Sequence, residues 1–485
     1  MKILFTHSYF LYFDSKQFEL SKPYPPLGTI TAAAYMREQG YDVALFDTYF
    51  SRDPQDVNAE LAKHEPEVLV IYDDGFNYLT KMCLTRMREA AFAMIQCAKA
   101  KGIHVILASS DSTDHYTEYL EKGADEIILG EGEITLLEVL NTLKNKGAVQ
   151  DLNGIAFKNG DEITKNPKRP ILTDLDSLPI PAWDLIDIEP YREAWSKYGY
   201  YSVNLATTRG CPYKCNWCAK PIYGNRYNSR SPQHVVREIQ YMQSLFEFDH
   251  VWFGDDIFGL KPSWVQEFNQ ELKKQGVSIR YKIQSRADLL LKDDTIDNLA
   301  ESGCEEIWIG AESGSQKILD AMDKGTSLAQ IIESTRLMKQ GGIKPCYFLQ
   351  FGYLTETWED IKMTLNLLFE QMPHDIGVSV SYPLPGTKFF DIVKSQLNDK
   401  ANWEDSDELL LMYKSTYSPE FYKRLHRYIH KRFRQKQAVA QMKKGNFKNF
   451  LKWGYFKMTS NYIYTQLLWL KRNSNAETVV MPQAV

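Results

Sequence analysis

Three closely spaced cysteines are the residues of this chain with the clearest chemical meaning. Cys211, Cys215 and Cys218 lie in the run TRGCPYKCNWC, directly after an apolar stretch that ends at Thr207. Three thiolates on one short loop can bind three irons of a [4Fe–4S] cluster, because such clusters prefer soft sulfur ligands. The next cysteine, Cys304, lies far along the chain and is interpreted as a packing residue. One iron would then remain for a ligand from outside the chain.

Other interpretations of the three cysteines are a zinc site, a redox pair or a chance grouping. A structural zinc site normally takes four protein ligands, and no histidine follows this loop closely. The spacing therefore favours an iron–sulfur cluster over zinc. A redox pair and a chance grouping stay open on this argument.

Length and composition indicate a multidomain soluble protein. A prior of about 150 residues per domain gives two to four domains for 485 residues. The chain is 44% hydrophobic and 25% charged, as in ordinary globular proteins. Its start, MKILFTHS, does not resemble a secretory signal, and no window of ~18 uncharged apolar residues predicts a spanning helix. We expect a cytoplasmic protein without structural disulfides among its seven cysteines.

Residues 1–150 alternate short apolar strands with helical segments. Strands are predicted at 3–6, 43–46, 68–72, 104–108 and 126–129, with helices between them, for example at 28–39 and 84–101. This alternation predicts a doubly wound, Rossmann-like sheet of the flavodoxin type. Ligands of such sheets bind at the carboxyl ends of the strands. Here those ends carry polar and glycine residues, at 7–8, 73–75, 109–111 and 130–133.

The remaining chain divides into three further segments. Residues 151–200 are rich in proline and glycine and predict a short hairpin followed by an extended linker. Residues 201–400 predict a partial (β/α)6 barrel, with strands at 202–207, 250–253, 280–283, 306–309, 345–351 and 376–379. Residues 401–485 predict a basic helical C-terminal region.

Charge is distributed unevenly along the chain. From Phe421 to Arg472 there are fourteen Lys or Arg residues and no Asp or Glu, so the remainder carries 43 basic against 62 acidic residues. The basic segment suggests an anionic partner. It interleaves apolar residues with Lys448, Lys452 and Lys457, which predicts peripheral contact with an anionic membrane; the apolar residues are Phe447, Phe450, Leu451, Trp453, Phe456, Ile463, Leu467 and Trp469. The alternative is a helix pair packed on the barrel with a solvated basic face. Nucleic acid is not favoured, because no known binding module is present.

The cysteine loop and the segments after it resemble the radical S-adenosylmethionine (SAM) superfamily. In that family, the amino and carboxylate groups of SAM chelate the open iron. Gly254, Asp255 and Asp256 match the position where the family contacts the methionine amino group, and carboxylate acceptors suit an ammonium donor. Arg286, Glu312 and Ser313 fall at strand ends where related enzymes hold the carboxylate and the ribose.

Three more segments are family-like, at 324–326, 352–357 and 382–387. The middle one departs from the usual Gly-x-Pro-Gly-Glu-Thr, because it has Leu354 and Thr355 in place of Pro and Gly.

The N-terminal half resembles the cobalamin-binding domain fused to one large radical SAM class. The resemblance rests on Pro-Pro-Leu-Gly at 25–28, before a helix, and on GADEIILGEGE at 123–133. It implies a cobalamin shelf at the strand ends, where glycines allow close backbone approach. The implied residues are Pro26, Leu27, Gly28, Asp74, Gly75, Ser109, Ser110, Asp111, Ser112, Gly130, Glu131, Gly132 and Glu133. The alternative is a doubly wound domain that only caps the barrel or binds substrate.

The chain lacks the Asp-x-His-x-x-Gly pattern whose histidine ligates cobalt from below in many cobalamin proteins. His7 is followed by Ser8, Tyr9 and Phe10, and His115 is interpreted as a surface residue. If cobalamin binds, its lower face is expected to meet water, a carboxylate, an aromatic ring or nothing.

Residues 403–435 resemble the C-terminal part of the subgroup that contains the anaerobic magnesium-protoporphyrin ester cyclase and enzymes acting on hopanoids and other lipids. The resemblance implies a 5′-deoxyadenosyl radical that activates an unactivated carbon, here for methylation of a small-molecule or lipid-like substrate. An electron donor such as flavodoxin or ferredoxin is also implied. Alternatives are cobalamin-dependent cyclisation or rearrangement without methyl transfer, and a cobalamin- or iron-dependent sensor with an inactive barrel.

Overall fold

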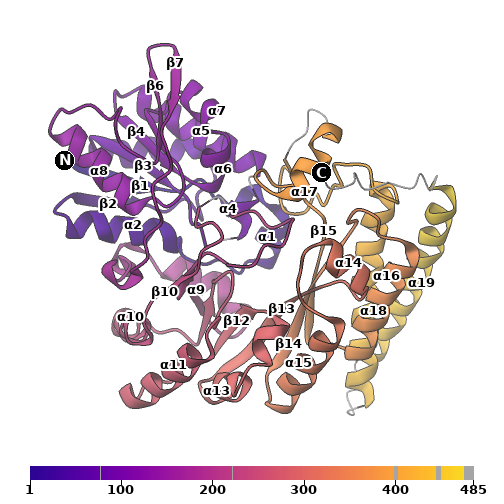
Figure 1. The fold of residues 1–485 in the computed structure, drawn as a ribbon. Coiled ribbons are helices and arrows are strands. Elements are labelled where there is room, and N and C mark those ends of the chain that lie inside the picture. Colours follow the sequence, from indigo (N-terminus) through magenta and orange to yellow (C-terminus); the bar gives the residue numbers. More distant parts are fainter. Residues whose placement is uncertain (77, 83, 221, 398–401, 444–448, 475–485) are drawn as a thin grey trace.

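A mostly parallel seven-stranded sheet, a parallel six-stranded sheet and a pair of long C-terminal helices form the main part of the molecule (Figure 1). The computed structural model describes residues 1–485 except 77, 83, 221, 398–401, 444–448 and 475–485. The indigo and purple N-terminal sheet lies above the pink and orange barrel strands, and the yellow α19 forms the outer edge. The predicted fold class is confirmed: a Rossmann-like sheet, a parallel half-barrel and C-terminal helices.

The N-terminal sheet has seven strands in the order β2-β1-β3-β4-β5-β6-β7. The first five are parallel: β1 (Lys2–Thr6), β2 (Asp42–Phe46), β3 (Val68–Tyr72), β4 (His104–Ala108) and β5 (Glu126–Ile128). The hairpin β6 (Ile155–Asn159) and β7 (Glu162–Lys165) extends the sheet antiparallel to β5. Every residue of β3 is buried, because helices cover both faces.

The helices of this half cover two separate cores. Residues of α2 (Leu27–Glu38) and α8 (Glu133–Lys144) pack on one face. Residues of α3 (Val57–His64), α5 (Thr85–Lys99) and α7 (Tyr116–Glu121) pack on the other. The shorter helices are α1 (Ser15–Leu20), α4 (Tyr78–Lys81) and α6 (Ser110–Asp114). The predicted strands agree with the observed ones to within one residue at each end.

The second sheet contains six parallel strands in the order β15-β14-β13-β12-β11-β8. They are β8 (Ser202–Leu205), β11 (His250–Phe253), β12 (Tyr281–Ser285), β13 (Cys304–Glu312), β14 (Lys344–Phe351) and β15 (Asp375–Val380). A separate two-stranded pair joins β9 (Thr208–Arg209) to β10 (Asn228–Ser229). The helices are α10 (Pro232–Leu245), α11 (Pro262–Gln275), α12 (Ala287–Leu290), α13 (Thr295–Glu301), α14 (Gln316–Ala321), α15 (Leu328–Gln340) and α16 (Trp358–Gln371).

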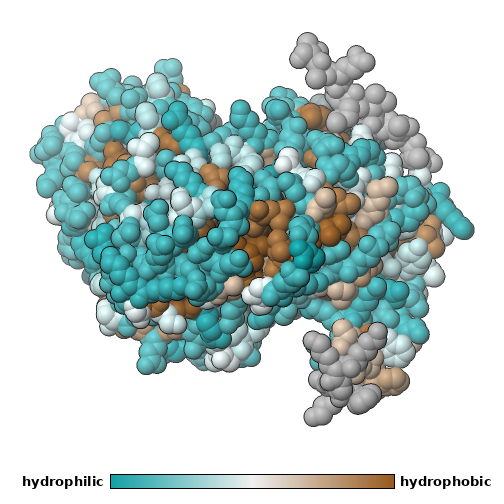
Figure 2. Space-filling model, turned by 60° about the horizontal axis from the view of Figure 1, so that its bottom comes forward, coloured by the Kyte–Doolittle hydropathy of each residue, from teal (hydrophilic) through white to brown (hydrophobic). Residues whose placement is uncertain are grey.

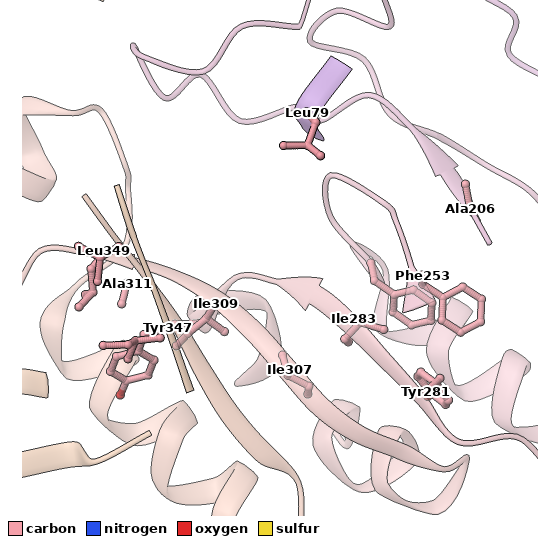
Figure 3. Packing of buried hydrophobic residues seen from close by; sticks show 14 of the residues in the cluster. Leu79, Ala206, Phe253, Tyr281, Ile283, Ile307, Ile309, Ala311, Tyr347 and Leu349 are labelled. Carbon is pink, nitrogen blue, oxygen red and sulfur yellow. The ribbon is translucent and has the colours of Figure 1, made fainter. Parts of the chain in front are cut away.

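The half-barrel sheet has one covered face and one open face. Tyr281, Ile283, Ile307, Ile309 and Tyr347 are fully buried in the large core cluster (Figure 3). Side chains alternate along a strand, so their neighbours Trp252, Lys282, Trp308 and Phe348 point to the opposite face, where they are partly exposed. Viewed with its lower side forward, the surface is mostly hydrophilic, with apolar side chains gathered near the middle (Figure 2).

The segment predicted as an extended linker contains regular structure. It has α9 (Glu189–Ser196) and two 3-10 turns, Leu175–Ser177 and Trp183–Leu185. Trp183 donates to Glu238 Oε1 at 3.0 Å, and Trp195 donates to the Pro23 carbonyl at 2.7 Å. Both indoles are buried in the core cluster that includes the barrel. The prolines in this segment favoured the prediction of an extended linker, but the segment contains a short helix whose apolar residues pack on both halves of the molecule.

Three helices end the described chain: α17 (Lys388–Val393), α18 (Pro419–Lys443) and α19 (Phe450–Asn473). Helices α18 and α19 pack along each other, and α18 also contacts α16 and β15. Phe447 and Lys448 of the predicted interfacial stretch lie outside the described residues. None of the helices in the described part of the chain combines the length and apolar character needed to cross a bilayer.

The departure from the family pattern at Thr355 imposes backbone strain. Thr355 has φ of +67°, in the left-handed region that favours glycine. It stands where the family pattern has glycine, so the loop keeps the conformation that glycine would adopt. Its carbonyl accepts a hydrogen bond from Lys317 Nζ at 3.3 Å, which any residue type can provide.

We therefore predict that Thr355→Gly stabilises the protein. A non-glycine residue in this conformation costs about 1–2 kcal/mol, and the greater freedom of glycine in the unfolded chain offsets part of the gain. The expected increase in the free energy of unfolding is about 0.5–1 kcal/mol, measured by urea denaturation. Thr355→Ala keeps the Cβ atom and is the control. Equal stabilisation by both substitutions would contradict the strain argument.

Candidate functional site

The cysteine loop begins at Gly210, where any other residue would force the neighbouring backbone to move. Gly210 has φ of +79°, and a Cβ atom there would lie 2.1 Å from the Arg226 carbonyl oxygen. The chain therefore turns sharply after β9 and enters the loop with Cys211. None of the three cysteines of the loop is in a disulfide; Cys211 is buried, and Cys215 and Cys218 are partly exposed.

Two polar residues inside the loop region fix its shape. Lys220 Nζ donates to the Cys211 carbonyl at 3.0 Å, to the Tyr213 carbonyl, and to Asn225 Oδ1 at 2.7 Å. Asn216, between the second and third cysteines, donates from its side chain to the Ala321 carbonyl at 2.7 Å. Its Oδ1 accepts from the Tyr353 hydroxyl at 3.0 Å. The loop is thus tied to α14 and to the end of β14.

The donor set of the loop fits a [4Fe–4S] cluster. Burial raises the pKa of Cys211 and raises that of Cys218 to about 12, so both thiols favour the protonated form until a metal binds. Among the described residues, no three His, Cys, Asp or Glu side chains converge on one ion position. Three unpaired thiols on one loop are the ligand type that iron–sulfur clusters require.

Asp255 is predicted to contact SAM, but in this structure its carboxylate forms hydrogen bonds with other residues of the protein. It accepts hydrogen bonds from the backbone and hydroxyl groups of Thr207 and Thr208, at 2.7 to 2.9 Å. Burial raises its pKa to about 6. Asp255 therefore joins the ends of β8 and β11. Asp256 is exposed, and its charge acts on Cys211 and Cys218.

Arg286 lies directly against the cysteine loop. Its guanidinium carbon is 3.6 Å from the centre of the Tyr213 ring. It donates to Asp288 Oδ1 at 2.9 Å and to Thr326 Oγ1 at 2.8 Å. The structure thus brings Arg286 against Tyr213 of the cysteine loop, although the two residues lie far apart in sequence.

Glu312 forms a buried ion pair with Lys324, a residue that sequence analysis did not single out as part of the site. Lys324 Nζ lies 2.7 Å from Glu312 Oε1, and a Cβ atom on Gly310 would lie 2.4 Å from that nitrogen. Burial alone would lower the pKa of Lys324, but Glu312 and Cys215 outweigh it and the pKa is raised. Ser313, also buried, shares a 3.0 Å hydrogen bond with Thr364. The family-like Lys-Gly-Thr segment at 324–326 was the sequence feature that could have indicated a role for Lys324.

Arg209, immediately before Gly210, joins the cysteine loop to the N-terminal sheet. Its guanidinium lies 2.5 Å from Glu131 Oε1 and 2.6 Å from Glu133 Oε1. All three side chains are nearly inaccessible to solvent. Burial alone would lower the pKa of Arg209, but the two carboxylates and Tyr223 outweigh it and the pKa is raised. The two glutamates predicted to contact cobalamin thus form ion pairs with Arg209.

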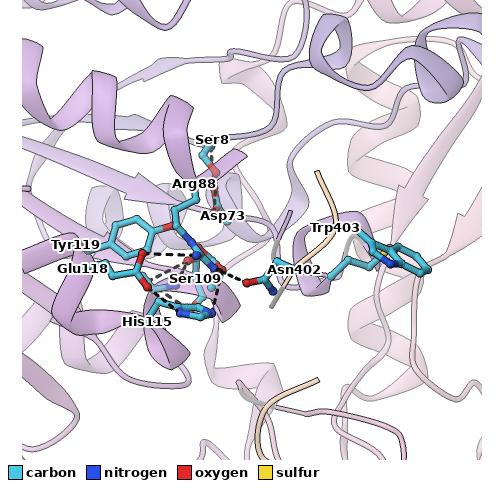
Figure 4. Close-up of polar contacts among 12 residues, drawn as sticks. Ser8, Asp73, Arg88, Ser109, His115, Glu118, Tyr119, Asn402 and Trp403 are labelled. Carbon is cyan, nitrogen blue, oxygen red and sulfur yellow. Dashed lines mark hydrogen bonds and ion pairs between the residues drawn. The ribbon is translucent and has the colours of Figure 1, made fainter. Parts of the chain in front are cut away.

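Asp111, another residue predicted to contact cobalamin, is also occupied within the protein. Arg88 donates to both of its carboxylate oxygens, at 2.7 and 2.6 Å, and Tyr119 donates at 2.6 Å (Figure 4). Arg88 also reaches Asn402 at 3.2 Å, which ties this loop to the region before α18. Ser109 caps α6 by accepting from the backbone of Ser112 at 2.8 Å.

The remaining predicted residues of the N-terminal site shape the ends of the strands. Asp74 Oδ1 accepts from the Gly28 backbone at 3.0 Å, next to Pro26 and Leu27 at the start of α2. Gly130 has φ of +91°. A Cβ atom on Gly132 would lie 2.7 Å from the Tyr72 ring, so glycine permits close packing there.

A cleft of about 240 Å3 lies between the two halves of the molecule. Its lining joins the strand ends of the first sheet to the cysteine loop and to β11: Gly75, Ser110, Ala219, Lys220, Ile222, Tyr223 and Asp256. The Ser110 hydroxyl is buried and has no hydrogen-bond partner among the described residues.

Neither histidine that sequence analysis considered points into this cleft. His7 Nε2 lies 2.9 Å from Asp47 Oδ1, and His115 Nδ1 lies 3.2 Å from Glu118 Oε1. His115 is partly buried beside Asp111, so its interpretation as a surface residue is wrong in part. The described residues that line the cleft include no histidine.

Comparison with protein families identifies the superfamily to which the half-barrel is similar. Residues 205–368 match the model of the radical SAM superfamily, a span that covers the cysteine loop and the strands from β11 to β14. The half-barrel of this chain is therefore a domain of the radical SAM superfamily. This superfamily implies a [4Fe–4S] cluster and SAM, and the protein is an enzyme of this class.

Several curated proteins are similar over most of their length. An uncharacterized methyltransferase of Pyrococcus horikoshii is 24% identical over 78% of this chain and 81% of its own. The anaerobic magnesium-protoporphyrin IX monomethyl ester cyclase of a Synechocystis species is 26% identical over 80% and 77%. The hopanoid C-3 methylase of Methylococcus capsulatus is 24% identical over 77% and 70%. Relatives of this radical SAM enzyme thus include methyltransferases and cyclases.

Solved structures support the two-sheet fold over nearly the whole chain. The cobalamin-dependent SAM radical enzyme OxsB with aqua-cobalamin bound superposes with a TM-score of 0.73 at 18% identity, covering 98% of this chain and 73% of that one. The radical SAM methyltransferase TsrM of Kitasatospora setae, with cobalamin and a [4Fe–4S] cluster bound, gives 0.65 at 17% identity, covering 81% and 75%. At these identities the comparison establishes the fold.

We predict that Arg209→Met strongly destabilises the protein, because it leaves Glu131 and Glu133 buried without a counter-charge. The expected loss is about 3–5 kcal/mol, seen as a lower urea midpoint. Arg37→Met is the control, since it breaks the exposed Arg37–Asp184 ion pair and should cost less than about 1 kcal/mol. Similar losses for the two variants would mean that the buried ion pair contributes no more than a surface one.

Proposed function

We propose that the chain is a cobalamin-dependent radical SAM enzyme that methylates an unactivated carbon of a small-molecule or lipid-like substrate. The observation that carries the proposal is the shared cleft, in which the cysteine loop faces the carboxyl ends of the N-terminal strands. These are the two places where each half of such a fold would hold its cofactor. Arg209 keeps them together.

Cys211, Cys215 and Cys218 would hold the cluster, which supplies one electron to SAM. Gly254 and Asp256 would accept from the methionine ammonium, since Asp255 is engaged with Thr207 and Thr208. Arg286 lies beside the loop, where it would bind the carboxylate. Glu312 and Ser313 would lie along the ribose, with Lys324 holding the Glu312 carboxylate in place. A donor such as flavodoxin or ferredoxin would supply the electron.

Gly75 and Ser110 would meet the cobalamin ring, which when bound supplies the methyl group. The Ser110 hydroxyl is a buried polar group in need of a partner, and burial without one is costly. Asp74, Ser109, Ser112, Gly130 and Gly132 would shape the shelf. Asp111, Glu131 and Glu133 would support it through Arg88 and Arg209 and would not contact the ligand. No lower histidine ligand is expected.

The open face of the half-barrel is the proposed substrate site. Trp308 and Phe348 lie there with ring centres 4.7 Å apart, and Lys282 lies over Trp252. Arg286 and Glu312 follow the same strands, so the site would adjoin SAM. Aromatic side chains and one cation suit a largely apolar molecule with a polar group. The alternative outcome is ring formation or rearrangement without methyl transfer, which the cyclase relatives support.

Cobalamin binding is expected to depend on Ser110. The apo-protein, incubated anaerobically with aquacobalamin, should show the visible spectrum of a cobalamin without a nitrogen ligand below cobalt. Ser110→Ala should weaken binding roughly threefold to tenfold, because one hydrogen bond is lost. Ser244→Ala, on the exposed part of α10, is the control. No cobalamin retained by the wild-type protein would refute this part of the proposal.

The methyl-transfer step is tested by isotope labelling. SAM carrying a 13C-methyl group should give one labelled methyl in the product, together with 5′-deoxyadenosine, during anaerobic turnover on extracts that contain candidate substrates. Mass spectrometry measures both. Deoxyadenosine with no label in any product would favour ring chemistry. The absence of both would favour a sensor with an inactive barrel.

A further inference from the structure

The outer face of α19 carries an unusual set of exposed apolar side chains. Leu451, Tyr455, Met458, Tyr462 and Trp469 are between 52% and 81% exposed. Single exposed apolar residues are common on soluble proteins, but these five are spaced four, three, four and seven residues apart. That spacing places them on one side of a helix, at the centre of the face turned away from the protein. We call them the α19 stripe.

The opposite side of α19 packs against the rest of the protein. Ser460, Ile463 and Leu467 are buried, and α18 lies along the helix on that side. Tyr455 has a contact with α18, since its hydroxyl accepts from Lys431 at 3.1 Å. Apart from this bond of Tyr455, the packing of the helix pair rests on the buried side of α19, and an exposed apolar surface of this kind marks an interaction site.

The charge around the stripe determines the kind of partner. Lys452, Lys457 and Arg472 are exposed beside it, and the segment 421–472 contains fourteen basic residues and no acidic one. Among the described ion pairs, Arg424 and Arg434 have the acidic partners Glu420 and Asp375. The rest of the chain is strongly acidic. An anionic surface would therefore attract the side of the molecule formed by α18 and α19, where α19 is the outer edge in Figure 1.

We infer that the α19 stripe binds the surface of an anionic lipid bilayer, with α19 lying in the plane of the interface. Leucine, methionine, tyrosine and tryptophan would enter the headgroup region, while the flanking lysines would contact lipid phosphates. This is peripheral binding, consistent with the absence of a spanning helix in the described chain. It is independent of the reaction proposed above.

The test is flotation of the full-length protein with vesicles of two compositions. Binding is expected to vesicles of equal phosphatidylcholine and phosphatidylglycerol, to be at least tenfold weaker with phosphatidylcholine alone, and to weaken in high salt. The triple variant Leu451→Ser, Met458→Ser, Trp469→Ser should lose at least tenfold in partitioning. The matched control removes three exposed apolar side chains elsewhere, with Leu245→Ser, Ile332→Ser and Met363→Ser, and should bind as the wild type does.

A second variant separates charge from apolar contact. Lys452→Glu with Lys457→Glu should abolish the preference for phosphatidylglycerol while leaving the thermal unfolding midpoint unchanged, because both side chains are exposed. Wild-type protein that does not float with the anionic vesicles would overturn the inference. A wild-type dimer that the triple variant converts to a monomer would also overturn it, because the stripe would then cover a second copy of the chain.

Discussion

One buried cation determines where the three cysteines lie. Arg209 directly precedes the glycine that opens the cysteine loop, and its guanidinium is held by Glu131 and Glu133 from the end of β5 and the start of α8. In a buried environment, removal of one member leaves the others as uncompensated charges. The loop therefore cannot move far from the N-terminal sheet while the ion pair persists. The ion pair therefore fixes the spacing between the cysteine loop and the strand ends where we propose that cobalamin binds.

Other buried contacts reinforce the same arrangement from each side. Lys220 and Asn216 tie the loop to itself and to α14, and Asp255 joins the ends of β8 and β11. Arg88 ties Asp111, in α6, to Asn402, which lies before α18. Rigid support of this kind is what a radical reaction requires, because reacting atoms must be held close together and away from water.

Much of the fold follows from local sequence patterns. Buried parallel strands are short apolar runs separated by helices, and each predicted strand from β1 to β5 lies within one residue of its observed bounds. The helix α9 was missed because it is short, has Pro190 in its first turn and owes its stability to the burial of Tyr191 and Trp195. The strain at Thr355 is visible only once the backbone is known.

The candidate site was predictable only where residue type alone fixes the chemistry. The three cysteines stand out in the sequence because three thiols at that spacing have few other uses, and their role as cluster ligands stays a prediction. The role of acidic residues at strand ends could not be assigned in the same way, since a carboxylate there can bind a ligand or another side chain. Glu131 and Glu133 pair with an arginine 76 to 78 residues away, and no local pattern encodes that distance. Lys324 can approach Glu312 because Gly310 has no Cβ atom in the way. No local sequence pattern indicates this contact either.

In the proposed enzyme, the cysteine loop leaves one iron of the cluster open to SAM. The most direct measurement is electron–nuclear double resonance on the anaerobically reconstituted, reduced protein, with SAM labelled by 15N in its amino group and 17O in its carboxylate. We expect coupling of both labels to the cluster, and its loss in Cys215→Ala. A cluster that shows no coupling, because side chains occupy every iron, or a single tetrahedral metal in place of the cluster, would contradict it.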